Sequence, residues 1–325
     1  MKAPARLGLY GLILVAVFVV SGFTANAVID EDTVQNWVDD ADHHSPEGHD
    51  AEGDDMSNGG HQGHGVDAAS VGLGVAQDGY QLTEVTAPGE TGTGGELSLA
   101  VTGPDGDRVT EFELDHEQEM HLIAVRADGQ HFRHVHPERD ENGTWSIPWE
   151  WEEAGTYRIF ADFVPAEVGE GLTLSTTVQV AGIYDPVVAE PASETTVDGF
   201  DVAVEGDLVA GEASELTMTI TRDGEPVTEL EPYLGAFGHL VALREGDLAY
   251  LHVHPHGDAP EASEISGPEI VFEATAPTEG RYLLFLDFQV DGNLHTAPLV
   301  VNTTSSTDSG DAGQANNEEG EDHDH

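Results

Sequence analysis

An internal duplication constrains the fold of this chain more than any other feature. The segment GDRVTEFELDHEQEMHLIAVRADGQHFRHVHPE aligns with the later segment GEPVTELEPYLGAFGHLVALREGDLAYLHVHPH, and AGTYRIFADF further on aligns with EGRYLLFLDF. Such self-similarity marks two copies of one structural unit. We therefore predict two domains, over residues 79–182 and 190–302, each of about 100 residues, which is a common single-domain size.

Each copy has the periodicity of β-strands. Apolar and polar residues alternate over 97–101 and over 216–220, and an Asp-Gly pair follows each stretch, which predicts strands that end in hairpin turns. The motifs A-G-x-Y, with Tyr157, and E-G-x-Y, with Tyr282, are typical of tyrosine corners in Ig-like folds. The expected fold class is all-β: two tandem β-sandwiches, Ig-like or cupredoxin-like, without a disulfide because the chain has no cysteine.

The N-terminus predicts export. A basic start precedes an apolar run from Leu7 to Val20 and an A-x-A site at 25–27, which together form a secretory signal peptide. The alternative is an uncleaved membrane anchor, since Leu7 to Ile29 carries no charge and reaches membrane-spanning length. Residues 1–29 are thus a signal peptide or an anchor helix. Either one places the rest of the chain outside the cell, free or at the cell surface.

Two segments lack the apolar residues that a core requires, and we expect them to be disordered. They are the acidic linker over 30–78 and the acidic tail over 303–325. Both are rich in histidine, and His-rich tracts bind metals loosely. The linker residues with this capacity are His43, His44, His49, Met56, His61 and His64.

The charge is extreme, with 63 Asp and Glu against 10 Lys and Arg, a formal net charge of −53. Nucleic-acid binding is therefore not expected, since phosphate contacts need Lys and Arg. Self-repulsion of this size destabilises a compact fold in ordinary buffer and becomes tolerable where molar salt shortens the Debye length to about 3 Å. We interpret the acidity as adaptation to a halophilic cell, in particular a haloarchaeal one.

The histidines of the first repeat predict a metal site. His134 and His136 lie two residues apart, so on a strand both side chains point to one face. A four-residue turn that pairs Arg126 with His131 sets His121 opposite His136, and directly paired residues share a face. One hairpin thus gathers three imidazoles.

The second repeat carries the same spacing. His239 should lie opposite His254, with His252 on the same face. Asp162 and Asp287 recur at matched positions in a later strand, and we expect them to be a fourth ligand or the acceptor for a ligand's N–H group. Neutral imidazoles suit copper or zinc. Copper is the favoured cofactor, and a blue-copper centre is excluded because it needs a thiolate. The alternative is a structural hydrogen-bond network of the same side chains.

Other residues with reactive side chains have simpler expected roles. The tryptophans Trp145, Trp149 and Trp151 are expected to pack in the core. Four histidines have no counterpart in the other repeat and are expected at the surface, namely His116, His131, His256 and His295.

The strings HLIAVRADGQHFRHVHPE, with GTW and AGTYRIFADF, and EPYLGAFGHLVALREGDLAYLHVHP, with GRYLLFLDF, resemble secreted His-rich β-sandwich proteins labelled heavy-metal-binding and common in actinobacteria. The resemblance covers about 79–302 and implies an extracytoplasmic protein for metal sequestration, delivery or resistance. The first repeat departs from the pattern at Met120, where the second has Gly238, and at His116, where it has Leu234.

Two other functions stay open. The first is a non-enzymatic Ig-like interaction or spacer module at the cell surface. The second is a cupin-type metalloenzyme that uses His134, His136 and Glu141, although the rest of the cupin pattern is missing. The sequence contains no Ser-His-Asp arrangement, phosphate-cradling glycine loop or assignable acid/base pair, so we expect the protein not to be an enzyme.

Overall fold

The structure is a computed structural model, and it describes residues 72–304 except 252, 258 and 262, and except the side chain of His254. The predicted signal or anchor, most of the acidic linker and most of the tail lie outside these residues. All described residues belong to one compact unit of the chain. No helix long and apolar enough to span a membrane occurs among them.

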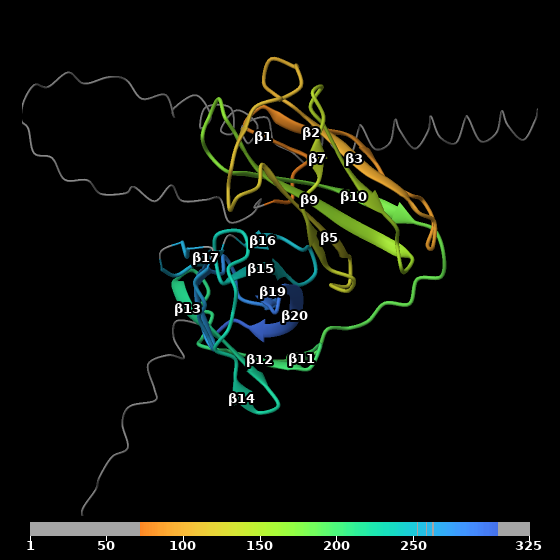
Figure 1. Cartoon of the computed structure of the whole chain (residues 1–325). Helices are drawn as coiled ribbons and strands as arrows, with labels where there is room; N and C mark the ends of the chain where they lie inside the picture. The colour runs from red at the N-terminus through yellow and green to blue at the C-terminus, as the bar shows by residue number, and fades with distance from the viewer. Residues whose placement is uncertain (1–71, 252, 258, 262, 305–325) are drawn as a thin grey trace, which may run out of the picture. The chain divides into compact units, whose positions relative to one another are not determined.

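The first repeat folds into a sandwich of two antiparallel sheets (Figure 1). One sheet has the order β1-β2-β3-β8-β7 and the other β10-β9-β5-β6, with β4 paired to β9. The strands are β1 (Ala76–Gln77), β2 (Tyr80–Thr86), β3 (Gly95–Thr102), β4 (Phe112–Glu113), β5 (Met120–Arg126), β6 (Arg133–Val135), β7 (Glu138–Arg139), β8 (Thr144–Trp149), β9 (Gly155–Pro165) and β10 (Leu172–Val180).

The second repeat has the same plan, with the orders β11-β12-β13-β18-β17 and β16-β15-β19-β20, and with β14 paired to β13. Its strands are β11 (Glu194–Val197), β12 (Phe200–Glu205), β13 (Ala213–Arg222), β14 (Glu225–Pro226), β15 (Gly238–Arg244), β16 (Tyr250–Leu251), β17 (Val253–Pro255), β18 (Glu269–Thr275), β19 (Arg281–Val290) and β20 (Asn293–Asn302). The described residues contain strands and no α-helix. The prediction of two tandem all-β Ig-like sandwiches is confirmed.

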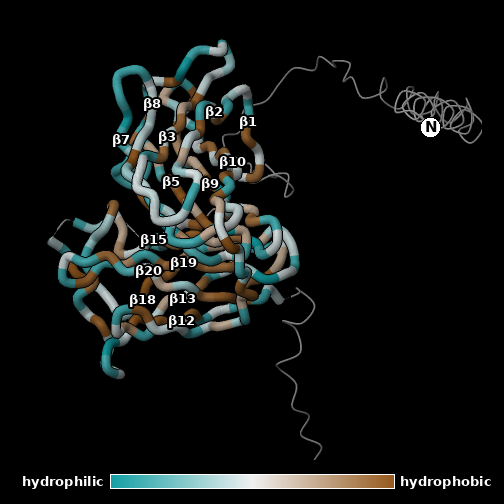
Figure 2. Tube along the Cα trace, turned by 90° about the vertical axis from the view of Figure 1, so that its right-hand side faces the viewer, coloured by the Kyte–Doolittle hydropathy of each residue, from teal (hydrophilic) through white to brown (hydrophobic). Residues whose placement is uncertain are grey.

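Each sandwich closes around its own apolar core. In β3 the inward side chains Leu97, Leu99 and Val101 are at most 1% exposed, as the alternating pattern predicts. In the second sandwich Leu216, Met218 and Ile220 on β13 have the same role. Figure 2 shows hydrophobic stretches along the central strands β13 and β19. The three tryptophans at 145, 149 and 151 lie in the first core, which confirms their packing role.

The predicted tyrosine corners are present in both repeats. The Tyr157 hydroxyl donates to the Glu153 carbonyl at 2.9 Å, and the Tyr282 hydroxyl donates to the Thr278 carbonyl at 3.0 Å. Each bond fixes the entry into the long strand, β9 or β19, that later carries a conspicuous aspartate. The corners therefore set the position of Asp162 and of Asp287 along their strands.

The strands β5 and β15 differ from β3 because side chains on both of their faces are buried. Leu122 and Ala124 point into the first core, while Ile123 and Val125 belong to a third apolar cluster. This third cluster contains residues of both sandwiches: Ile123, Val125, Phe160, Val241, Leu243, Leu248, Tyr250, Leu283 and Phe285. Phe132 and Phe285 stack within it, with ring centroids 4.0 Å apart. The two sandwiches thus share an apolar interface formed by the sheets of β5 and β15.

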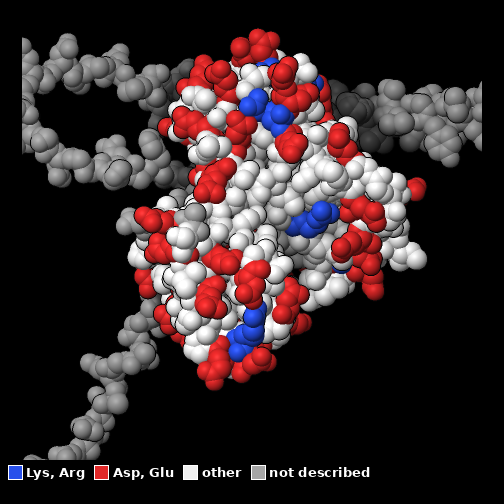
Figure 3. Space-filling model, in the orientation of Figure 1, with Lys and Arg blue, Asp and Glu red and all other residues white. Residues whose placement is uncertain are grey.

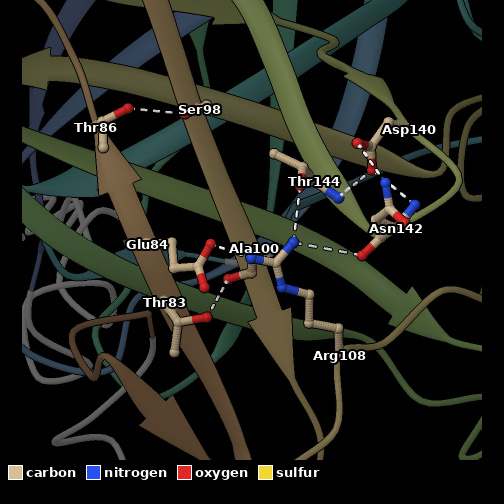
Figure 4. Close-up of polar contacts among 9 residues, drawn as sticks. All are labelled: Thr83, Glu84, Thr86, Ser98, Ala100, Arg108, Asp140, Asn142 and Thr144. Atoms are coloured by element: carbon tan, nitrogen blue, oxygen red, sulfur yellow. Dashed lines mark hydrogen bonds and ion pairs between the residues drawn. The ribbon is translucent and has the colours of Figure 1, made fainter.

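Charged groups occupy the surface. Figure 3 shows acidic side chains spread over the face in view, with few basic ones between them. One of the few arginines, Arg108, pairs with Glu84 on β2 and donates to the Thr144 hydroxyl on β8 at 2.9 Å (Figure 4). Asp140 closes the turn before β8 by accepting from the backbone N–H of Thr144 at 2.8 Å. These contacts fasten the outer sheet of the first sandwich.

Candidate metal centre

The hairpin of β5 and β6 brings together the three predicted imidazoles of the first repeat. Leu122 pairs with Val135 and Ile123 with His134, which is the predicted register and the one that sets His121 opposite His136. Ligating nitrogens of His121, His134 and His136 all lie within 4.8 Å of one another. Within the described part of the chain, this is the group of side chains that meets the geometric requirement for holding a metal ion.

The nitrogens that face each other are close. Nδ1 of His121 lies 3.0 Å from Nε2 of His134 and 3.2 Å from Nε2 of His136. Two nitrogens bound to one tetrahedral zinc ion, each at about 2.0–2.1 Å from it, lie roughly 3.3 Å apart. Both separations from Nδ1 of His121 are therefore close to the separation of two nitrogens on one such cation.

Hydrogen bonds on the outer sides of two rings determine which nitrogens carry protons. Nε2 of His121 lies 3.0 Å from the Asp115 carbonyl oxygen, and Nδ1 of His134 lies 2.8 Å from Oδ2 of Asp287. A carbonyl and a carboxylate only accept, so both ring nitrogens must donate. In the neutral imidazoles, Nδ1 of His121 and Nε2 of His134 therefore both carry lone pairs, although these two atoms lie only 3.0 Å apart.

This arrangement favours a cation over a hydrogen-bond network. Nδ1 of His121 has one lone pair and accepts one hydrogen, yet it has two nitrogen neighbours, in His134 and His136. A proton satisfies only one of these contacts, whereas a metal ion satisfies all three nitrogens at once. The outer bonds to Asp115 and Asp287 are those that orient metal-ligating histidines in proteins.

Burial favours the neutral forms of His121, His136 and His239. It lowers the pKa of His121 to about 4 and that of His136 to about 3, with the nearby His134 lowering both further. The pKa of His239, from the second repeat, is lowered to about 4, again mainly by burial. A neutral imidazole is the form that binds metal. At neutral pH, protons therefore compete little for these nitrogens.

The same upstream turn holds His121 and His239 in their repeats. Asp115 and Gln118 exchange backbone hydrogen bonds of 2.9 and 3.0 Å, and Tyr233 and Ala236 form the matching turn. In the second turn, the Tyr233 carbonyl accepts from Nε2 of His239 at 2.8 Å. Each turn thus orients a ring so that its Nδ1 is free of this bond and available to a ligand.

The second hairpin does not repeat the first. It begins in the predicted register, because Ala242 pairs with Leu251, but there the pairing ends. His254 pairs with Glu273 of β18 in the opposite sheet, so the predicted pairing of His254 with His239 is wrong. The reason is that the chain crosses between sheets directly after β16. His252 and the side chain of His254 lie outside the described residues.

His239 instead joins the histidines of the first repeat. Its ring centroid lies 6.4 Å from that of His134 and 4.8 Å from that of His116. His116, expected at the surface, also lies 6.3 Å from His121 by ring centroids. It occupies a left-handed position in its turn, with φ of 45°. No sequence pattern indicated this, because its counterpart Leu234 is apolar.

The two predicted carboxylates have different roles. Asp287, on β19 of the second sandwich, accepts from His134 of the first, and their side chains are only 2% and 5% exposed. Asp162, on β9, accepts from the hydroxyls of Thr173 at 3.0 Å and Tyr250 at 3.4 Å. The sequence pairs each aspartate with its own repeat, whereas in the structure each one also bonds to the other repeat, Asp287 to His134 and Asp162 to Tyr250.

A small cavity adjoins the triplet. Its volume is about 50 Å³, and a water molecule needs about 10–15 Å³ of such space. Polar groups from both sandwiches line it, including His121 and His134 from the first and His239 from the second. The cavity therefore offers room for a further ligand of a bound metal. A larger groove of about 680 Å³ lies between Trp149, Trp151 and Tyr157 but contains none of the converging nitrogens.

The remaining candidates lie elsewhere. His131 is 3.7 Å from the Glu152 carboxylate, and His295 binds Asp198 at 2.8 Å. His256 is exposed, and so is Glu141, the carboxylate of the cupin alternative, in the turn after β7.

Comparisons with known proteins show relationship but no assigned activity. No curated protein matches the chain. Among solved structures, the adhesin InvE of Yersinia pseudotuberculosis is 11% identical, with a TM-score of 0.21, over 68% of this chain and 58% of that one. A putative membrane anchored protein of Corynebacterium diphtheriae is 13% identical, with a TM-score of 0.20, over 68% of this chain and 57% of that one. Salmonella alpha-2-macroglobulin reacted with methylamine is 15% identical, with a TM-score of 0.24, over 73% of this chain and 15% of that one.

The chain thus spans less than two thirds of the length of each of these three structures, and likenesses of this size carry no argument about function. A family match is more extensive. Residues 75–182 and 195–305 each match the family described as Domain of unknown function (DUF8832). The two matched stretches contain the described strands of the two sandwiches except Glu194, the first residue of β11. The chain belongs to the DUF8832 family, and carries its domain twice.

Proposed function

We propose that this protein is an extracytoplasmic, non-enzymatic metal-binding protein that holds one copper or zinc ion through His121, His134 and His136. One observation carries the proposal: Nδ1 of His121, which accepts a single hydrogen, has two imidazole nitrogens within 3.2 Å. The apolar run from Leu7 to Val20 supports a place outside the cell. The physiological role would be metal sequestration, delivery or resistance.

The donor set favours copper. Affinity of a nitrogen site for divalent metals rises to a maximum at Cu²⁺ and falls at Zn²⁺. The three donors are imidazole nitrogens, and the adjoining cavity leaves space for a water molecule. Zinc therefore also fits, as a three-His site with an open position.

The test is equilibrium dialysis of the full chain against Cu²⁺ and Zn²⁺ in molar salt. We expect one tight equivalent per chain, and its loss in the variant His134→Ala/His136→Ala. The variant His131→Ala is the matched control, since His131 lies on the same hairpin but outside the triplet, and it should keep the tight equivalent. Unchanged tight stoichiometry in the double variant would refute the proposal.

A second candidate function is a non-enzymatic Ig-like interaction or spacer module at the cell surface. The tandem arrangement of two Ig-like sandwiches favours it. In that case the triplet is only a structural network, and the stability of the protein is independent of chelator. The dialysis experiment separates the two functions, because the module requires no tight metal equivalent.

A further inference from the structure

We infer that the two repeats share one metal centre across their interface: His134 of the first sandwich is positioned by Asp287 of the second, so metal binding and docking of the sandwiches are coupled. This inference rests on the proposed function. The sequence predicts two independent sites, one for each repeat. We infer instead a single site whose metal affinity depends on both repeats.

The contact between His134 and Asp287 supplies the coupling. Nδ1 of His134 donates to Oδ2 at 2.8 Å, and the other carboxylate oxygen accepts from the Thr296 hydroxyl. A buried carboxylate on the outer nitrogen of a ligand fixes the ring and raises its basicity. Asp287 is therefore a positioning residue, and it can act on His134 only while the sandwiches are docked.

The apolar interface is continuous with this contact. Phe132, two residues before His134, stacks on Phe285, two residues before Asp287, with centroids 4.0 Å apart. Leu283 lies in the same cluster. On the adjacent position of β19, Leu284 points the other way and belongs to the second sandwich's own core. A substitution at Leu283 therefore perturbs the interface between the sandwiches, whereas one at Leu284 perturbs the core of the second sandwich.

His239 places the second repeat next to the ligands as well. Its ring lies 6.4 Å from that of His134 by centroids and lines the same cavity. Both repeats therefore contribute polar side chains to one enclosure, on the side of the triplet where a further ligand would sit.

The experiment measures metal affinity in four variants of the full chain by competition with a chromophoric chelator, using Cu²⁺ and Zn²⁺ in molar salt. Asp287→Asn should weaken binding about 10- to 100-fold and shift the visible absorption band of the Cu²⁺ complex. Asp291→Asn removes the same charge from an exposed position four residues away and should change neither. Circular dichroism checks that each variant is folded.

Leu283→Ala should weaken binding at least about fivefold, a typical lower bound for coupled sites, because it loosens the docked arrangement. Leu284→Ala should leave the affinity unchanged, even though it destabilises the second sandwich. Wild-type affinity in both Asp287→Asn and Leu283→Ala would overturn the shared centre while the proposed function stands. A wild-type chain without a tight equivalent would overturn both.

Discussion

Adding copper or zinc to the chelator-treated chain is expected to raise its stability by about 4 kcal/mol when the free metal reaches a thousand times its dissociation constant. The substitution His121→Ala should abolish this gain, because Nδ1 of His121 makes both close nitrogen contacts in the triplet. The measurement is thermal unfolding in molar salt, with and without metal.

This measurement does not respond to metal that is bound only by histidines of the linker or the tail. Their histidines would bind metal equally in the folded and unfolded chain, and such binding does not stabilise the fold. The variant His131→Ala, on the same hairpin, should keep the full metal response. If His121→Ala responded to metal as the unaltered chain does, the triplet would not be the site.

Acid is expected to destabilise the metal-free protein steeply between pH 6.5 and 5. The pKa values of His121 and His239 are lowered to about 4, and that of His136 to about 3, chiefly by burial. The unfolded chain takes up protons on these imidazoles below pH 6.5, while the folded chain does not. The free energy of unfolding therefore decreases as the pH is lowered. The decrease is about 1.4 kcal/mol per pH unit for each proton that the unfolded chain binds and the folded chain does not.

Denaturant unfolding at a series of pH values in chelator and molar salt measures this slope. The range from pH 7 to 5 avoids most of the titration of the surface carboxylates. The variant His121→Gln removes one excluded proton and should give a shallower slope. A stability that stayed constant or rose as the pH fell through this range would contradict the assignment of neutral, buried rings.

Local patterns predicted much of the fold. The alternation over 97–101 and 216–220, the two tyrosine corners and the hairpin register of β5 and β6 all depend on residues close in sequence. The predicted register of the second hairpin is wrong after Leu251, because the chain there crosses to the other sheet and pairs with β18. Spacing along the chain does not encode that pairing.

The candidate site was predictable only within one repeat. His121, His134 and His136 converge because one hairpin sets their positions, whereas Asp287 and His239 reach them across an interface. One signal for that interface was present in the sequence: the apolar runs of β5 and β15, unlike that of β3, do not alternate. A strand with two apolar faces needs a second partner, which here is the other repeat.

The most direct test is a crystal of the full chain, grown with copper or zinc and examined by anomalous diffraction at the absorption edge of the metal. We expect one strong peak about 2.0–2.1 Å from Nδ1 of His121 and from Nε2 of both His134 and His136. The absence of a peak there, with those nitrogens still in contact and metal bound only at other histidines, would contradict it.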